Sequence, residues 1–246
     1  MTTEERVAKL IKVGQARGFW RRGVGFPHHA RQIYGTVSFE GKRVLEIGCG
    51  RGVFCFWAAI HGASRVLGLE PMAAGFYDAQ NYMEEFRKIG RELQLKEIDI
   101  ESTLIQDFRP PDNSFDIVLA LSALNHFHEE ECIHLHESQA ARRIYTDLFR
   151  NVRRMMSKGG TLILTDCDKN SFWSDVGLKH PFKPHIEWHK HQKPQLWIDI
   201  LSEAGFGEAK LQYPCPLYGR YLGITYVPGF VSYMLDNAFR IQMTAM

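Results

Sequence analysis

Three glycines at alternate positions mark the segment best suited to hold a ligand. Gly48, Gly50 and Gly52 follow an apolar run, and a helix-like segment comes next. Glycine allows positive φ angles and lets a ligand lie against the backbone. The start of a helix offers unpaired N–H groups, which suit a carboxylate or a phosphate. The spacing is not that of the dinucleotide fingerprint or of a Walker loop. A ligand-binding turn is therefore predicted, with a tight strand-to-helix turn as the alternative.

Two acids follow the next apolar runs along the chain. Glu70 ends the second run, a position from which a carboxylate can accept hydrogen bonds from the hydroxyls of a ribose. Asp107 follows the third, where it could accept a hydrogen bond from an adenine amine beside the apolar Phe108. Each acid alone could be a solvated loop residue. Together with the glycine turn, they predict a nucleoside-shaped crevice at the switch point of a parallel sheet.

The order and spacing of these motifs resemble the class I S-adenosylmethionine-dependent methyltransferases of the small-molecule type. The resemblance covers about residues 41–165. The sequence departs from the family pattern at one position after the second strand. Pro71 has no backbone N–H there, so Met72 must supply any backbone N–H contact to the cofactor. The motifs that carry it are Glu46-x-Gly48-x-Gly50-x-Gly52, Glu70, Asp107 and the apolar run from Phe115 to Leu121.

The resemblance implies S-adenosylmethionine as the cofactor and a role for each motif. The glycine turn would contact the methionyl part, and Glu46 would orient that turn. Glu70 would hold the ribose, Asp107 and Phe108 would frame the adenine, and the main chain near Leu121 would border the methionyl amine. The implied cofactor-binding residues are Glu46, Gly48, Gly50, Gly52, Glu70, Met72, Asp107, Phe108 and Leu121.

Histidines are concentrated in two segments that could supply a base. A hydroxyl acceptor must lose a proton during methyl transfer, and histidine is the usual base near neutral pH. His126 follows the fourth apolar run, and His180, His185, His189 and His191 lie in a later insert. The alternative for His126 is a histidine that packs or caps at a helix entry. The predicted catalytic residues are His126, His189 and Asp166, the last at the end of the fifth apolar run.

A divalent metal is a weaker alternative for the same residues. His126 and Glu130 are four apart and would share a helix face, with Asp166 at the end of the neighbouring strand. Such nitrogen and oxygen ligands could orient a diol. No tight ligand motif is present, so we expect no metal.

The insert at residues 171–193 mixes aromatic and ionisable side chains. Trp173, Phe182 and Trp188 could stack on a ring or a sugar face while His189 acts as the base. A surface loop that only covers the sheet is the alternative. We expect the acceptor to be a hydroxyl, or an amine, of a sugar or secondary metabolite.

Other acceptors and functions are less well supported. Enzymes that methylate exocyclic base amines carry an Asp/Asn-Pro-Pro-aromatic turn after the fourth strand, whereas residues 120–124 read Ala-Leu-Ser-Ala-Leu. A nucleic-acid acceptor is therefore not expected, although a local cluster of lysines keeps an RNA acceptor open. A non-catalytic subunit that binds S-adenosylmethionine and activates another chain is a further alternative. The oligomeric state is not predicted.

These motifs need a parallel sheet to position them. The alternation of short apolar runs with helix-like segments predicts an α/β fold, with a doubly wound, mostly parallel seven-stranded sheet and helices on both faces. The expected strands are 43–47, 66–69, part of 98–105, 115–121, 161–165, 208–213 and 221–227. The expected helices are 3–15, 53–61, 71–93, 130–157, 194–204 and from 230 onward. Residues 18–40 look irregular.

We expect one domain, residues 1–246, with three parts. Residues 1–40 would form an N-terminal helical lid, and 41–167 the cofactor-binding core. Residues 168–246 would hold the acceptor-side insert after the fifth strand, the last strands and a C-terminal helix.

The composition fits this fold. Hydrophobic residues make up 45% and charged residues 24% of 246, which excludes a disordered or fibrous chain. Thirty Lys and Arg against 28 Asp and Glu leave a net charge of +2, too small for binding nucleic acid or lipid by electrostatics alone. The chain has no long apolar run and no predicted signal peptide. Five cysteines without a C-x-x-C pair indicate reduced thiols, so we expect a cytoplasmic protein without a membrane partner.

Overall fold

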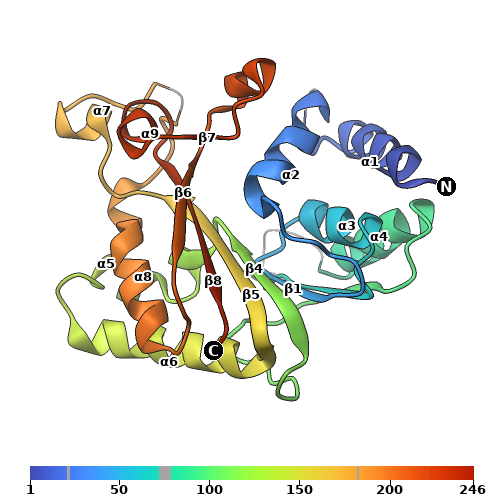
Figure 1. Cartoon of the computed structure of the whole chain (residues 1–246), viewed down its shortest axis with the longest axis horizontal. Coiled ribbons are helices and arrows are strands. Elements are labelled where there is room, and N and C mark those ends of the chain that lie inside the picture. Colours follow the sequence, from blue (N-terminus) through green and yellow to red (C-terminus); the bar gives the residue numbers. More distant parts are fainter. Residues whose placement is uncertain (21–22, 72–78, 182) are drawn as a thin grey trace.

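The computed structural model describes residues 1–20, 23–71, 79–181 and 183–246. Within these ranges a mixed sheet lies between helices on both faces (Figure 1). The strands are β1 Arg43–Ile47, β2 Arg65–Leu69, β3 Ile98–Glu101, β4 Phe115–Leu121, β5 Met156–Cys167, β6 Lys210–Pro214, β7 Tyr226–Val227 and β8 Ala238–Thr244. Their order in the sheet is β3-β2-β1-β4-β5-β8-β6-β7.

The helices alternate with the strands along the first two thirds of the chain. The α-helices are α1 Thr3–Ala16, α2 Phe26–Tyr34, α3 Val53–Ile60, α4 Ala79–Glu92, α5 Glu129–Ile133, α6 Gln139–Met155, α7 Phe172–Asp175, α8 Pro194–Glu203 and α9 Gly229–Leu235. Short 3₁₀ turns are η1 Gly23–Gly25, η2 Leu124–His126, η3 Trp188–Lys190 and η4 Leu217–Leu222. None of the helices in the described ranges is long and apolar enough to cross a membrane.

The sheet is parallel where the sequence predicted the cofactor site. β3, β2, β1, β4 and β5 are parallel neighbours, whereas β8 pairs antiparallel with β5 and β6. The carboxyl ends of parallel strands meet at one edge of a sheet, and order reversal between β1 and β4 creates the switch point. The α/β fold class and the doubly wound arrangement are therefore confirmed.

The C-terminal part differs from the prediction. The described residues form eight strands rather than seven, because the helix expected from residue 230 onward ends with α9 and the chain continues as β8. Phe239, Ile241 and Met243 alternate along β8 and are buried, which is the period-two pattern of a strand. The expected C-terminal helix is wrong beyond residue 235 for this reason.

Two further expectations on helices were wrong in detail. The single helix expected at 130–157 is interrupted at residues 134–138, where Ser138 caps α6 by accepting a hydrogen bond from the Ala141 N–H at 3.2 Å. The segment expected to be irregular contains α2, which has Pro27 in its first turn. β5 also begins earlier than expected, at Met156.

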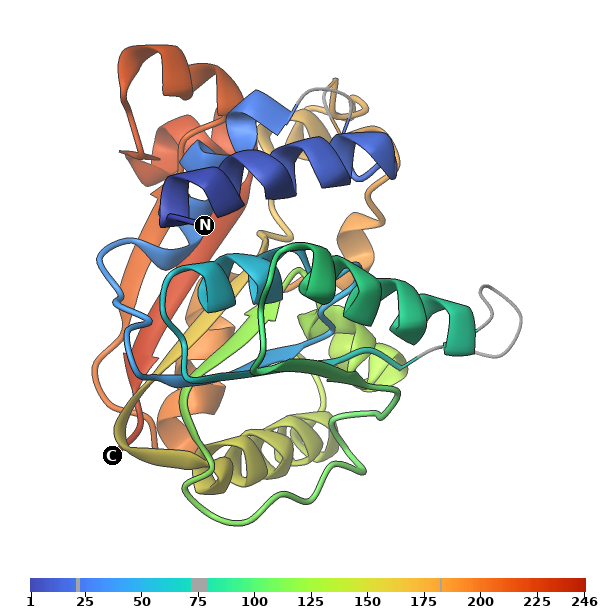
Figure 2. The same cartoon turned by 90° about the vertical axis from the view of Figure 1, so that its right-hand side faces the viewer.

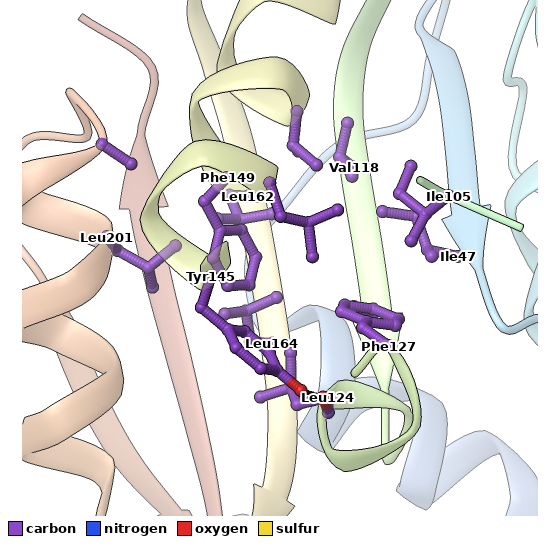
Figure 3. Packing of buried hydrophobic residues seen from close by; sticks show 14 of the residues in the cluster. Ile47, Ile105, Val118, Leu124, Phe127, Tyr145, Phe149, Leu162, Leu164 and Leu201 are labelled. Atoms are coloured by element: carbon purple, nitrogen blue, oxygen red, sulfur yellow. Dashed lines mark hydrogen bonds between the residues drawn. The ribbon is translucent and has the colours of Figure 1, made fainter. Parts of the chain in front are cut away.

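The core consists of two apolar layers separated by the sheet. On the face of α6 and α8, Leu162 and Leu164 of β5 pack near Tyr145, Phe149 and Leu201 (Figure 3). Ile163 points to the opposite face and belongs to the cluster that includes α3. Burial on both faces explains why the central strands are almost continuously apolar. A rigid sheet therefore supports the strand ends.

The first helix forms an outer layer beyond α3 and α4 (Figure 2). Arg17, at its end, makes ion pairs of 2.9 Å with Glu85 and 2.8 Å with Glu92 of α4. The N-terminal segment is thus fixed to the side of the sheet that carries the glycine turn.

Candidate functional site

The glycine turn joins β1 to α3, and each glycine adopts a positive φ. The angles are 68°, 50° and 69° at Gly48, Gly50 and Gly52. A Cβ on Gly52 would lie 2.0 Å from Phe86 Cε2, and one on Gly48 would lie 2.8 Å from Ala123 Cβ. A Cβ on Gly50 would meet no atom within 4 Å. Gly48 and Gly52 are required for packing, and the backbone at Gly50 faces open space in which a ligand could lie.

The carboxylate of Glu70 contacts this turn directly. The Gly50 N–H donates a hydrogen bond of 2.7 Å to Glu70 Oε2, which joins the turn after β1 to the end of β2. Partial burial raises the pKa of Glu70, while the Gly50 N–H and the nearby charge of His126 oppose that rise. The structure therefore brings together two residues that the sequence assigned to one cofactor.

Glu46 lies beneath the turn and is buried. The Cys55 thiol donates to Glu46 Oε2 at 2.9 Å. Burial raises the pKa of Glu46 to about 8, with a smaller contribution in the same direction from Glu70 and an opposing one from the Cys55 hydrogen bond. Its hydrogen-bond partner Cys55 is on α3 rather than on the turn, so the predicted role of Glu46 in orienting the turn stays a prediction.

The end of β4 lies next to the glycine turn. Leu121 is half-buried, and Ser122 turns the chain with a φ of 53° while its N–H donates to the Thr165 carbonyl at 2.8 Å. Ala123, which follows, occupies the space beside Gly48. The predicted placement of Leu121 at the tip of a central strand is found, whereas its contact to a methionyl amine stays a prediction.

The predicted adenine-binding residues, Asp107 and Phe108, do not share the direct contact with the glycine turn that Glu70 makes in the described structure. Phe108 is 8% exposed, belongs to the core and lies 6.3 Å from the Phe115 ring. Asp107 beside it is exposed. No contact between Asp107 and the turn is present in the described part of the chain, so both roles stay predictions. Met72 lies outside the described residues.

The insert after β5 folds back over the strand ends. Asp166 is 3% exposed, and its Oδ1 lies 2.8 Å from Nδ1 of His191, whose side chain is 13% exposed. His189 is exposed and makes no contact with Asp166 in the part of the chain that the structure describes. The structure thus brings the predicted Asp166 together with a histidine of the insert, but that histidine is His191.

An ion-pair network connects the insert to the segment after β4. Lys190 lies 2.7 Å from Glu129 and 2.8 Å from Glu187, and His126 Nδ1 is 3.6 Å from Glu129. The carboxylates raise the pKa of Lys190 above its usual range, and Lys190 lowers the pKa of Glu129. His126 is 65% exposed, so it borders the same edge of the sheet from the solvent side.

Aromatic rings line the inner part of the insert. The rings of Trp188 and His180 are 5.5 Å apart, and those of Trp188 and His191 are 6.3 Å apart. Trp173 donates its indole N–H to the Met234 carbonyl. Trp188 is therefore placed to contact a flat ligand beside His191, whereas the predicted Phe182 lies outside the described residues.

A metal ion at the same edge of the sheet would need several nitrogen, oxygen or sulfur ligands close together. Among the residues described, no group of three or more His, Cys, Asp or Glu side chains is placed to hold a metal ion. Glu130, the other predicted ligand, is exposed.

The sequence missed two contacts of this site. Cys55 carries no motif, but it lies nine residues after the buried Glu46 and is its thiol donor. His191 was one of several histidines in the insert, and no spacing distinguished it from His189. A buried acid in need of a donor is the signal that could have found Cys55, whereas nothing local identifies His191.

The sequence is similar to known methyltransferases. A family model described as a methyltransferase domain matches residues 19–207, which is more than half of the chain. A ubiquinone biosynthesis O-methyltransferase of Rhodopseudomonas palustris is 30% identical over 121 residues, or 49% of this chain and 44% of that protein. One of Marinobacter nauticus is 26% identical over 189 residues, or 73% and 69%. The chain thus spans under half the length of the first relatives it matches.

Solved structures share the fold. The crystal structure of an S-adenosylmethionine-dependent methyltransferase from Mesorhizobium loti matches with a TM-score of 0.61 and 19% identity, covering 90% of this chain and 98% of that one. The family match confirms the methyltransferase family and the cofactor that the resemblance implied, and the likeness to the solved structure confirms the fold. The chain belongs to the methyltransferase domain family and has the fold of the class I S-adenosylmethionine-dependent methyltransferases.

Proposed function

We propose that this protein transfers the methyl group of S-adenosylmethionine to an oxygen atom of a small-molecule acceptor. The single observation that carries the proposal is the hydrogen bond from the Gly50 N–H to Glu70, which unites the glycine turn and the acid of β2 at one edge of the sheet. The choice of oxygen is supported by the relatives named as ubiquinone biosynthesis O-methyltransferases.

The residues at this edge fit the cofactor. Open space over Gly50 leaves the backbone accessible to an amino-acid end. Among the described residues, Glu70 Oε2 accepts a hydrogen bond from the Gly50 N–H and Oε1 accepts none, so a ribose hydroxyl can donate to Oε1. The N-terminus of α3 has no side-chain cap and offers its N–H groups to a carboxylate.

The protein's own part in the reaction is alignment. The cofactor supplies a methyl group activated by the positive charge on sulfur, so the chain must bring the acceptor oxygen in line and exclude water. The carboxylate of Glu70 lies at the glycine turn and favours a bound cation. The insert, with Trp188 and the ion pair of Lys190 with Glu129, would close the acceptor side.

We also propose that the N-terminal segment acts as the lid of this site. The Arg51 side chain of the glycine turn donates to the Arg17 carbonyl at 3.2 Å, and its guanidinium lies 5.1 Å from the centre of the Phe19 ring. Closure or opening of residues 1–40 would therefore act on the turn through Arg51. Residues 41–167 would bind the cofactor, and 168–246 would serve the acceptor.

The flat side chain of Trp188 supports an acceptor with a ring or a sugar face. The test is a screen of phenols, catechols, sugars and primary amines with S-adenosylmethionine, in which release of S-adenosylhomocysteine is measured and the methylated product is identified by mass spectrometry. We expect turnover with a hydroxyl compound. Methylation of amines alone, or cofactor binding without turnover of any class, would contradict the proposal. A chelator added to the active assay tests for a required metal, and we expect the rate to be unchanged.

A further inference from the structure

We propose that His191, positioned by Asp166, is the base that takes the proton from the acceptor hydroxyl. The inference rests on the proposed function, because only transfer to an oxygen that carries a proton needs such a base. It assigns a role to a histidine that the sequence did not separate from its neighbours.

The contact between the two side chains sets the ring of His191. Nδ1 lies 2.8 Å from Asp166 Oδ1, an oxygen that also accepts the Cys167 N–H at 2.7 Å. A carboxylate oxygen requires a donor, so Nδ1 carries the proton and Nε2 keeps its lone pair. Within the described residues, Nε2 of His191 makes no hydrogen bond. The nitrogen needed for proton removal is therefore free.

Asp166 is suited to stabilise the charge that forms on the ring. Its side chain is 1% exposed, and Oδ2 is buried with no hydrogen-bond partner within the described ranges. A buried carboxylate with one oxygen unpaired is poorly solvated, which favours a positive charge on the group that touches it. The group in contact is His191, so proton uptake by this imidazole improves the environment of Asp166.

A short series of contacts connects this pair to the glycine turn. Gly48 packs against Ala123, and the preceding Ser122 N–H donates to the carbonyl of Thr165. Asp166 follows Thr165 directly along β5. His191 thus lies over the end of β5, next to the strand tip that borders the turn, and Trp188 lies beside its ring.

The two histidines predicted from the sequence are less well held. His126 is 65% exposed and its partner Glu129 is 3.6 Å away, also at the surface. His189 is exposed, and neither residue touches a buried carboxylate in the described structure. A general base must be held in position before the substrate binds. Of His126, His189 and His191, only His191 is held by a buried acid in the described structure.

The proposed step conserves atoms and charge. The acceptor O–H bond breaks, and its proton passes to Nε2 of His191. An oxygen lone pair forms the new bond to the methyl carbon, and the electron pair of the carbon–sulfur bond returns to the sulfur, which becomes neutral. Asp166 keeps its charge and pairs with the imidazolium, which later releases its proton to water.

The pH dependence of this base is set by several nearby groups. Asp166 contacts it directly, and Lys190 is its neighbour in the chain. The other titratable groups whose charges reach this neighbourhood are Glu129, Cys132, Cys167, Lys169, Lys183, Glu187 and Asp236. The carboxylates and the lysines carry opposite charges, and Asp166 is the one charged group in this set that contacts the ring directly.

The test compares His191→Gln with His136→Gln, a change at an exposed histidine between α5 and α6. It uses the full chain and catechol, or the hydroxyl acceptor that the screen returns, as the probe. We expect kcat of His191→Gln to fall on the order of a hundredfold or more, with KM changed only a fewfold. The acidic limb of the wild-type pH profile should disappear, so that the rate follows ionisation of the acceptor. His136→Gln should keep the wild-type profile.

Asp166→Asn provides a second test, the pH dependence of kcat, which would not change if Asp166 had only a structural role. The amide can still accept from Nδ1 but carries no charge, so the acidic limb should shift to lower pH while kcat falls. Calorimetry with S-adenosylmethionine and thermal melting show whether each variant is folded. A folded His191→Gln that retains kcat or the acidic limb would overturn the inference. Absence of methyl transfer by the wild-type chain would instead overturn the proposed function, and the inference with it.

Discussion

Gly50 and Glu70, twenty residues apart, are joined by a 2.7 Å hydrogen bond from the backbone N–H to the side-chain carboxylate. The bond crosses between the neighbouring parallel strands β1 and β2 at their carboxyl ends. It therefore makes the shape of the glycine turn depend on the acid that is proposed to bind the ribose. A change at Glu70 acts on two parts of the cofactor at once.

Glu70→Ala should weaken binding of S-adenosylmethionine by about 2 kcal/mol, or about thirtyfold, because a charge-assisted hydrogen bond is lost. Glu70→Gln keeps the shape and one acceptor oxygen and should lose less. Titration calorimetry measures both, with Glu97→Ala as the control at an exposed acid. An affinity of Glu70→Ala equal to that of the wild type would remove Glu70 from the site.

Alanine at Gly52 should mainly lower the stability of the protein, whereas alanine at Gly50 should mainly lower its affinity for the cofactor. Gly52→Ala places a methyl group 2.0 Å from Phe86 Cε2 at a φ of 69°, so it should lower the free energy of unfolding by about 3 kcal/mol. Gly50→Ala meets no atom and should cost only about 1 kcal/mol for its positive φ. Its methyl group enters the open space over the turn, so cofactor affinity should fall in this folded variant. Urea denaturation and calorimetry measure the two quantities, and equal losses of stability would contradict the assignment.

Glu46 should make the ligand-free protein less stable as the pH rises. Burial raises its pKa to about 8, whereas an unfolded glutamate titrates near about 4.3. The folded state therefore binds the extra proton between these values, and the free energy of unfolding should decline from about pH 4 to about pH 8 and level off above. Glu46→Gln should remove this part of the decline. The difference between the two chains in urea denaturation, measured from pH 5 to 9, isolates the effect; a constant difference would show that Glu46 titrates normally.

Arg240 should be essential for docking of α2. Its side chain is fully buried and donates to Gln212 Oε1 at 2.8 Å, to Gln242 Oε1 at 2.7 Å and to carbonyls of α2. Arg240→Met leaves these acceptors without donors and should cost about 3 kcal/mol of stability. Denaturation of this variant is compared with that of Arg143→Met, at an exposed arginine. Similar stabilities of the two variants would show that α2 is held by apolar packing alone.

The sequence predicted the central strands well because they are buried on both faces. The bounds of β1 and β4 agree with the predicted runs at 43–47 and 115–121, where nine of the twelve side chains are apolar. The turn and the acid of β2 followed from the same pattern, since parallel strands bring their carboxyl ends together. Local composition was enough for this half of the site.

Features that depend on distant partners were not predicted. β8 pairs with β5, and although Phe239, Ile241 and Met243 alternate with polar residues, seven residues of local pattern did not identify the strand without that partner. The contact of Asp166 with His191 joins residues 25 apart and requires the insert to fold back over the sheet. No periodic pattern in the insert predicts that it folds back over the sheet. The sequence therefore offered several histidines and did not distinguish among them.

The position of β8 between β5 and β6 has a consequence for biosynthesis. β6 and β7 leave the ribosome before β8, yet β6 joins the sheet through β8. Until β8 emerges, the nascent chain carries an open β5 edge whose N–H and C=O groups can pair with another polypeptide. Chaperone protection of that edge would be needed late in synthesis, and mutations that delay β8 should promote aggregation before they impair the finished enzyme.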